Sequence, residues 1–358
     1  MNSNYIGIAN ADLSRTEALF GEHIESDPQP RWELLLLFLP GAVRHHRELV
    51  ARESLPISCK LPWQPVAALL TVAWCALPAQ AASSIVRDGS IGAGPTAVLT
   101  PSGTVSRGSA SYQQITIPEN YGQRAGGNVF HSFSKFSVGS GDGAVFTING
   151  PASNVISRVT GGQLSTINGL LKLDPGSTGS APNFFFINPA GVTFGAGAVV
   201  DVPAALHVST ANYLKFPDGN FQADPGTAST FSSAAPEAFG FLGTTRATVT
   251  VNGGALISPS SPFPISVVGG DIGIDQGHLV TIGGGDIRVV AMGQHTQEVP
   301  LFGSLPAAYG ILAILNGGVL AADSVDGLNG GNVTVSGGNI MIYSQVISSF
   351  FYTFVCDT

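Results

Sequence analysis

Three aspartates that lie close together in this sequence are candidates for metal binding or acid–base catalysis. Asp271, Asp275 and Asp286 lie in a Gly-rich stretch, and closely placed carboxylates can bind calcium or act as acid and base on a sugar chain. Their positions near glycine pairs, however, are those where Asp commonly caps a turn. A regular Gly- and Asp-rich calcium-binding period is absent. We therefore expect no catalytic carboxylates. An enzyme that acts on carbohydrates and has a β-helical fold is kept as an alternative to a non-enzymatic function.

The remaining candidates for catalysis or ligand binding are also isolated. His131 and His207 each lie between strand-forming residues, without a third metal ligand nearby in the sequence. We interpret them as hydrogen-bonded structural histidines. Residues 283–285 are three glycines without the lysine of a phosphate-binding loop, and no nucleophile elbow is followed by a suitable Asp and His. The sequence predicts no enzyme, no cofactor and no metal.

Composition favours a β-rich fold. The 358 residues include 46 glycines, only 11% are charged, and the net charge is −8. Ordinary proteins have about 7% Gly and about 25% charged residues, so a helical enzyme is disfavoured. Basic residues are scattered singly, whereas nucleic-acid binding requires a clustered basic surface. The three cysteines, Cys59, Cys75 and Cys356, do not form a disulfide framework or a zinc site.

Residues 1–81 are predicted to be an extended leader and signal peptide. Residues 66–76 are apolar but too few to span a bilayer, which takes about 20 residues. Ala79 and Ala81 follow as a small-residue cleavage site. The mature chain should begin near Ala82 and meet the membrane only in transit. Residues 1–60 are either part of an extended signal region or precede the true start of translation.

Beyond Ile85 the chain reads as short strands separated by turn residues. Four Gly pairs, each followed by a polar residue and alternating apolar positions, recur at residues 269–274, 284–289, 330–335 and 337–342. Alternation places one set of side chains inward, and Gly permits tight corners between strands. Such units bury their apolar faces by stacking as the coils of a solenoid. A β-sandwich is the alternative fold.

Several long motifs between Gly126 and Gly243 carry a family resemblance. They are residues 127–136 (Gly-Asn-Val-Phe-His-Ser-Phe-Ser-Lys-Phe), 154–162 (Asn-Val-Ile-Ser-Arg-Val-Thr-Gly-Gly), 165–170 (Ser-Thr-Ile-Asn-Gly-Leu), 183–192 (Asn-Phe-Phe-Phe-Ile-Asn-Pro-Ala-Gly-Val), 194–195 (Phe-Gly), 206–211 (Leu-His-Val-Ser-Thr-Ala) and 239–242 (Phe-Gly-Phe-Leu). Together they resemble the secretion (haemagglutination activity) domain of two-partner secretion exoproteins of the filamentous haemagglutinin type.

The resemblance implies an all-β fold, a right-handed parallel β-helix with an N-terminal cap and extra-helical strands. It implies a two-partner secretion domain at residues 82–250 and the start of a β-helical shaft at 251–358. The irregular end of the sequence is expected to reflect truncation or a frameshift. The implied partner is an outer-membrane barrel transporter with periplasmic domains, and the implied product is a secreted or cell-surface Gram-negative adhesin whose ligand stays open. A remnant of a toxin-delivery exoprotein is a further alternative.

Motif residues are expected either to determine the fold or to contact the transporter. They are Asn128, Phe130, His131, Phe133, Phe136, Asn154, Arg158, Asn188, Pro189 and Gly191. Asn188-Pro189-Ala190-Gly191 stands where some family members have Asn-Pro-Asn-Leu, and its chemistry predicts a turn. The three phenylalanines should stack within β-coils. Asn128, Asn154, Asn168 and Asn183 should satisfy backbone groups at corners or in ladders.

Overall fold

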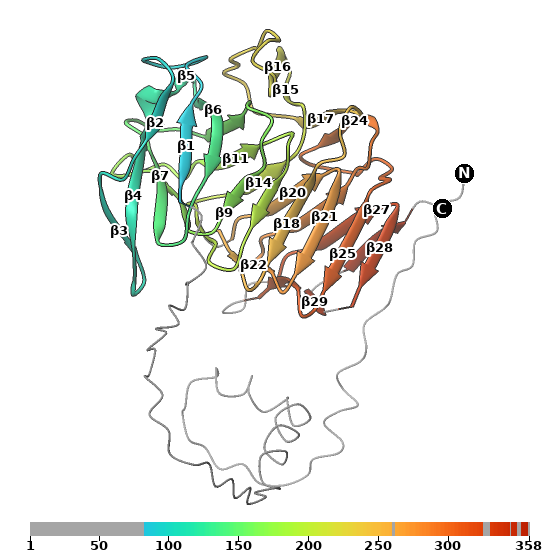
Figure 1. Ribbon diagram of the computed structural model, residues 1–358. Coiled ribbons are helices and arrows are strands. Elements are labelled where there is room, and N and C mark those ends of the chain that lie inside the picture. Colours follow the sequence, from blue (N-terminus) through green and yellow to red (C-terminus); the bar gives the residue numbers. More distant parts are fainter. Residues whose placement is uncertain (1–81, 260–261, 325–329, 344, 349–351, 357–358) are drawn as a thin grey trace, which may run out of the picture. The chain divides into compact units, whose positions relative to one another are not determined.

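The computed structural model describes residues 82–259, 262–324, 330–343, 345–348 and 352–356 (Figure 1). The predicted leader, with Ala79 and Ala81, lies outside the described residues. Within the described residues, the one helical element is the 3-10 helix η4 at Glu119–Tyr121. In that same part of the chain, no helix has the length and apolarity to cross a membrane.

Three long sheets, here called I, II and III, form the body of the fold. Sheet I contains β1 (Ser84–Arg87), β2 (Ala97–Leu99), β5 (Gln123–Ala125), β6 (Asn128–Ser137), β8 (Asn154–Val159), β11 (Asn183–Ile187), β14 (Leu206–Ser209), β20 (Ile265–Gly269), β23 (Ile287–Ala291), β27 (Val333–Gly337) and β30 (Tyr352–Cys356). Sheet II contains β3 (Gly103–Arg107), β4 (Ala110–Pro118), β7 (Asp142–Thr147), β10 (Leu170–Asp174), β13 (Val199–Asp201), β19 (Leu256–Ile257), β22 (His278–Ile282), β26 (Val319–Asp323) and β29 (Gln345–Ser348). Sheet III contains β9 (Ser165–Ile167), β12 (Val192–Phe194), β18 (Thr248–Asn252), β21 (Asp271–Asp275), β25 (Ile311–Leu315) and β28 (Asn339–Ile342).

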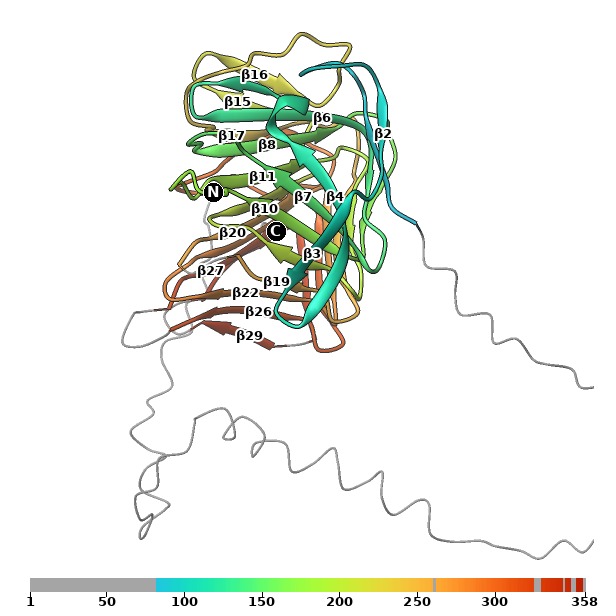
Figure 2. The same cartoon turned by 90° about the vertical axis from the view of Figure 1, so that its left-hand side faces the viewer.

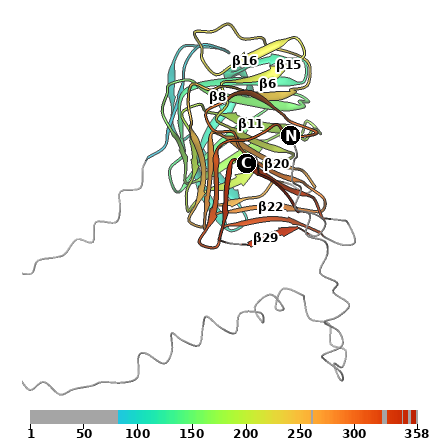
Figure 3. The same cartoon turned by 90° about the vertical axis from the view of Figure 1, so that its right-hand side faces the viewer.

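After β8 the strands of the coil follow one another in the order sheet III, sheet II, sheet I. Apart from β9, which is the first strand of sheet III, each of them pairs in parallel with its equivalent one coil earlier. For example, Phe184 of β11 lies opposite Val155 of β8 and Leu206 of β14. The views from both sides show these stacked coils (Figures 2 and 3). The predicted parallel β-helix is confirmed.

The N-terminal end of the coil is covered by antiparallel strands. In sheet I, β1 pairs antiparallel with β2 and β6, and β5 pairs antiparallel with β6. In sheet II, β3 pairs antiparallel with β4, which begins the parallel stack. These strands form the predicted N-terminal cap.

A fourth, antiparallel sheet lies outside the coil and forms the predicted extra-helical strands. It contains β15 (Tyr213–Phe216), β16 (Gly219–Gln222), β17 (Ala238–Leu242) and β24 (Thr296–Pro300). Its first three strands follow β14, whereas β24 comes from beyond β23 and pairs with β17. The last strand of this sheet therefore comes from a segment more than fifty positions further along the chain than β17. In Figure 1 the sheet lies along the upper side of the coil.

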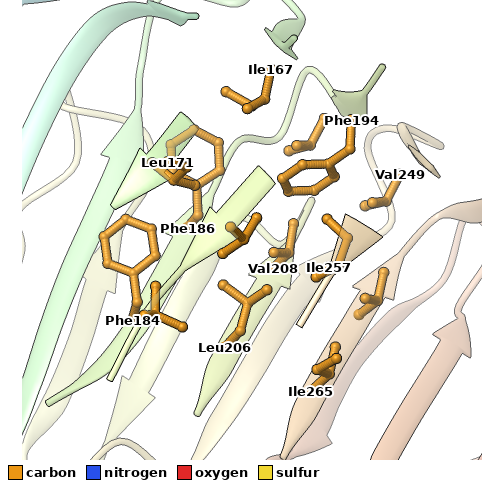
Figure 4. Packing of buried hydrophobic residues seen from close by; sticks show 14 of the residues in the cluster. Ile167, Leu171, Phe184, Phe186, Phe194, Leu206, Val208, Val249, Ile257 and Ile265 are labelled. Atoms are coloured by element: carbon orange, nitrogen blue, oxygen red, sulfur yellow. The ribbon is translucent and has the colours of Figure 1, made fainter. Parts of the chain in front are cut away.

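Two hydrophobic cores lie on opposite faces of sheet I. Alternation in β11 sends Phe184 and Phe186 into the coil interior and Phe185 and Ile187 to its outer face. The inner core runs from Ile85 to Val335 without interruption (Figure 4 shows its middle part). The outer core is closed by the extra-helical sheet. This explains why the run from Phe184 to Ile187 is apolar at every position.

The Gly pairs precede strands, as predicted, but for a partly different reason. At Gly270 a Cβ would lie 2.8 Å from the carbonyl oxygen of Ala247, and at Gly331 it would overlap the carbonyl of Gly285. These glycines allow adjacent coils to approach closely, and neither has a positive φ. Gly284, by contrast, is in the left-handed region, with φ of +104°.

Candidate functional site

An asparagine ladder crosses the first coils of sheet I. Asn128, Asn154 and Asn183 occupy one position in β6, β8 and β11. The Asn154 amide donates to Asn128 Oδ1 at 2.8 Å, and the Asn183 amide donates to Asn154 Oδ1 at 2.9 Å. Asn128 donates to the backbone carbonyls of Ser232 and Ala234, at 2.8 and 2.7 Å. The ladder predicted from the motifs therefore also fixes the segment that follows β16.

Arg158 in β8 is buried on the outer face of sheet I, with 3% of its surface exposed. Its Nε donates to Ser132 Oγ at 2.8 Å, Nη1 donates to Ser229 Oγ at 3.0 Å and to the carbonyl of Gln222, and Nη2 donates to Ser90 Oγ at 3.0 Å. The guanidinium thus joins the cap, the coil and the extra-helical hairpin. Burial lowers the pKa of Arg158, which nonetheless stays charged at neutral pH because an arginine ordinarily titrates above about 12.

Asp88, next to the cap strand β1, supplies the counter-charge of this cluster. Its carboxylate accepts hydrogen bonds from Ser132, Thr160 and Ser90, at 2.5, 2.9 and 2.7 Å. Burial by itself would raise the pKa of Asp88, but these hydrogen bonds hold it below the usual range. We call Asp88, Ser90, Ser132 and Arg158 the Arg158 cluster. The motif at residues 154–162 marks Arg158, whereas no motif marks Asp88, which lies seventy positions earlier.

The phenylalanines of β6 divide between the two cores. Phe133 and Phe136 both face the coil interior, with ring centroids 5.0 Å apart. Their spacing of three residues is possible in a strand because the pairing with β1 shifts at Ser134, which forms a bulge. Phe130 faces outward and packs on Phe221 at 4.9 Å. The predicted stacking inside the coil holds for the first two, whereas Phe130 anchors the extra-helical sheet.

The prediction of hydrogen-bonded histidines is wrong for His131. Both of its ring nitrogens are buried without a hydrogen-bond partner, and the ring lies against Phe133 and Phe146. Burial lowers its pKa to about 3, so the imidazole is neutral at neutral pH. His207 is similar: its Nδ1 has no partner, its ring stacks on Phe185 at 4.3 Å, and burial lowers its pKa to about 3.

Residues Asn188 to Gly191 form the predicted turn between β11 and β12. Asn188 Oδ1 accepts from the Ala190 amide at 2.9 Å, and its Nδ2 donates to Ser165 Oγ and to the carbonyl of Gln163, both at 2.9 Å. The Gly191 amide donates to the Asn188 carbonyl at 3.0 Å. Asn188 is fully buried, whereas Pro189 is partly exposed.

A groove of about 650 Å³ separates this turn from the extra-helical sheet. Its walls are largely uncharged, with amide and hydroxyl side chains. They include Thr160, Asn188, Pro189, Asn212, Tyr213, Asn220, Gln222, Asp224, Thr227 and Leu242. Leu242 is 48% exposed at its margin. Pro189, which is partly exposed, lines this groove.

The aspartates considered for catalysis link adjacent coils instead of meeting one another. Asp271 accepts from Arg246 Nε at 2.7 Å and from the Ile311 amide at 2.6 Å. Asp275 accepts from Asn316 Nδ2 at 2.8 Å. Within the described residues, no group of three or more His, Cys, Asp or Glu is arranged to hold a metal ion.

The chain shows one match to a known protein family and a likeness to a solved structure. Residues 97–348 match the family described as TPS secretion domain. A comparison with curated proteins finds no match. Among solved structures, the HMW1 secretion domain from Haemophilus influenzae is similar, with 17% sequence identity and a TM-score of 0.38 over 75% of this chain and 66% of that one. The chain therefore spans just under two thirds of the length of that structure.

Proposed function

The chain belongs to the family of two-partner secretion exoproteins that carry a TPS secretion domain, and we propose that its transporter recognises it before it folds. Family membership over residues 97–348 is the observation that carries the function, export by a two-partner system. Such a system includes an outer-membrane transporter. The route passes through the periplasm, and we propose signal-peptide cleavage after Ala81.

Burial of the motif residues supports recognition before folding. Asn128, His131 and Arg158 are at most 3% exposed, and Phe130 and Asn188 are fully buried. A partner cannot reach these side chains in the folded coil. They are accessible only in the unfolded chain, or they act solely by specifying the fold. Pro189 and the groove beside it are the exceptions.

The physical mechanism we propose is strand addition. An extended segment supplies backbone N–H and C=O groups to the free edge of a partner sheet, while alternate side chains give specificity. The short strands of this chain suit that mode, since β8 and β11 later use the same backbone groups to stack on each other. Periplasmic domains of the transporter would provide the sheet edge, and folding into coils outside the cell would favour outward movement.

The mature product is proposed to be a secreted or surface-attached adhesin. In this proposal residues 82–250 act in recognition, and residues 251–358 provide the first coils of an adhesive shaft. The alternatives are a toxin-delivery exoprotein and a carbohydrate-active β-helix enzyme. The coil-linking hydrogen bonds of Asp271 and Asp275 give the enzyme alternative no support.

A binding experiment tests recognition before folding. Purified periplasmic domains of the transporter encoded beside the chain are mixed with residues 82–358, either rapidly diluted from urea or fully refolded. We expect the freshly diluted chain to bind and the refolded chain to bind at least roughly tenfold more weakly, because refolding buries the motifs. Equal binding of both forms would place recognition on the folded surface, with the groove beside Pro189 as the first candidate.

A further inference from the structure

A second cleft, here called the Arg288 cleft, lies on the outer face of sheet I, beyond the region covered by the extra-helical sheet. Its volume is about 460 Å³. Its floor is formed by β14, β20, β23 and β27, and its opposite wall by residues 301–305, which follow β24. Specific small-molecule sites in proteins occupy roughly 300–1,000 Å³, so the cleft is large enough for a ligand.

One outward-facing row of side chains changes character at this cleft. In the first coils the row consists of Phe130, Ile156 and Phe185, which the extra-helical sheet covers. In the following coils the same position is occupied by polar residues, namely His207, Ser266, Arg288 and Thr334. Paired strands lie about 4.8 Å apart, so these four groups form a regular polar line.

Arg288 is held in a fixed orientation. Its Nη1 donates to the carbonyl of Leu301 and its Nη2 to the carbonyl of Gly303, both at 2.9 Å. These two bonds attach the guanidinium to the loop that forms the opposite wall. A prearranged donor of this kind loses little side-chain freedom when a ligand binds.

His207 adds a buried group that the fold leaves unpaired. Only 4% of its surface is exposed, it forms part of the cleft wall, and its Nδ1 has no hydrogen-bond partner. Burial, and then the charge of Arg288, keep its pKa at about 3, so the ring is neutral and offers one donor and one acceptor.

The cleft also contains acceptors and an apolar rim. Asp286 lies beside Arg288, and its carboxylate accepts from the backbone and side-chain nitrogens of Asn332 at 2.7 and 3.2 Å. Phe302 lines the cleft with 74% of its surface exposed. An anionic ligand would be repelled by Asp286. A ligand with hydroxyl groups, which both donate and accept, matches the mixture of groups.

We infer that the Arg288 cleft binds a saccharide unit. Sugar hydroxyls would bond to Arg288, Asp286 and the polar line, while an apolar face of the sugar ring would lie on Phe302. Apart from His207, which lies in the motif at residues 206–211, the groups involved are absent from the transport motifs. Arg288 and Phe302 can therefore be substituted without changing a motif residue. The cleft would give the exported chain a surface ligand of its own.

Saturation-transfer NMR on the secreted chain tests the inference. The probes are the methyl glycosides of glucose, galactose, mannose and N-acetylglucosamine, with sodium acetate and sodium sulfate as anionic comparisons. We expect transfer to at least one glycoside. Phe302→Ser and Arg288→Gln should each weaken its binding roughly three- to tenfold. Tyr343→Ser, which removes another exposed aromatic ring outside the cleft, should leave binding unchanged.

Thermal unfolding of each variant separates lost binding from lost structure. Phe302 is so exposed that its substitution should leave the fold intact, which makes this variant decisive if Arg288→Gln unfolds. Absence of transfer to all four glycosides would overturn the inference. So would anion binding without glycoside binding, or transfer that persists undiminished in Phe302→Ser.

Discussion

At the scale of single residues, the motifs place polar side chains where they connect separate parts of the chain. Arg158 shows this most directly, because its partners come from the cap, from β6 and from the extra-helical hairpin. Motif recognition could identify Arg158 as important. It could not identify Asp88 as part of the same cluster, since nothing local marks a contact that depends on how distant coils stack.

Substituting Arg158 should therefore destabilise the whole chain. Arg158→Met leaves the half-buried Asp88 without the nearby positive charge and removes several hydrogen bonds of a buried guanidinium. We expect a loss of about 3–5 kcal/mol in the free energy of unfolding. Arg158→Lys should recover little of the lost stability, because the ammonium of lysine cannot reproduce the planar, forked arrangement of donors of the guanidinium. Urea denaturation measures both, with the partly exposed Arg107→Met as the matched control. A loss for Arg158→Met no larger than that of the control would contradict this assignment.

His131 makes stability depend on pH. Its pKa is about 3 in the folded chain and about 6.5 when unfolded, so its contribution is fully present above pH 6.5 and is lost as the pH falls toward 3. At pH 5 protonation of the unfolded imidazole alone should cost about 2 kcal/mol of stability. The charges of Glu119 and Arg87 shift the pKa of His131 in opposite directions, and each shifts it less than burial does.

His131→Leu should remove that dependence. We expect the variant to be at least as stable as the parent at pH 7.5, because it buries no unpaired ring nitrogen, and to gain a further ~2 kcal/mol relative to the parent at pH 5. Urea denaturation at the two pH values provides the measurement, with exposed His295→Leu for comparison. An unchanged difference between the two pH values would show that His131 is not the titrating group.

At the scale of elements, the strands and the turn at Asn188 follow from local sequence, whereas their partners do not. Short strands separated by turn residues are predicted beyond Ile85, and β8 and β11 begin where the motifs at residues 154–162 and 183–192 begin. The pairing of β24 with β17 could not be predicted, because it joins segments more than fifty positions apart and nothing in the local sequence of either strand marks its partner. The close approach of Gly331 to the carbonyl of Gly285 in the adjacent coil could not be predicted either, because it depends on how the coils stack.

Gly191 tests the turn. Its φ is +114°, and a Cβ there would lie 2.9 Å from Leu164 Cδ1 and 3.1 Å from the Thr248 carbonyl oxygen. Gly191→Ala should cost more than about 1 kcal/mol of unfolding free energy, through backbone strain and crowding together. Gly103→Ala is the control, since its φ is not positive and nothing lies within 4 Å of the added Cβ. Equal stability of the two variants would contradict the geometry of the turn.

At the scale of the whole molecule, the inner core is continuous across position 250 and the extra-helical sheet needs β24. Val299 of β24 and Leu301, the residue that follows β24, are both buried in the outer core. A fragment of residues 82–250 should therefore unfold less cooperatively, and at lower urea, than one of residues 82–305. Denaturation followed by two spectroscopic probes compares them, and identical transitions would support a folding unit that ends near 250.

Export through a dedicated transporter can be measured as secretion of the tagged chain. The chain, residues 1–358 with a C-terminal tag, is expressed with and without the neighbouring two-partner transporter, and the tag is quantified in medium, periplasm and cells. We expect release into the medium only when the transporter is present. Retention in the periplasm in both strains, with cell lysis excluded by a periplasmic marker, would contradict it.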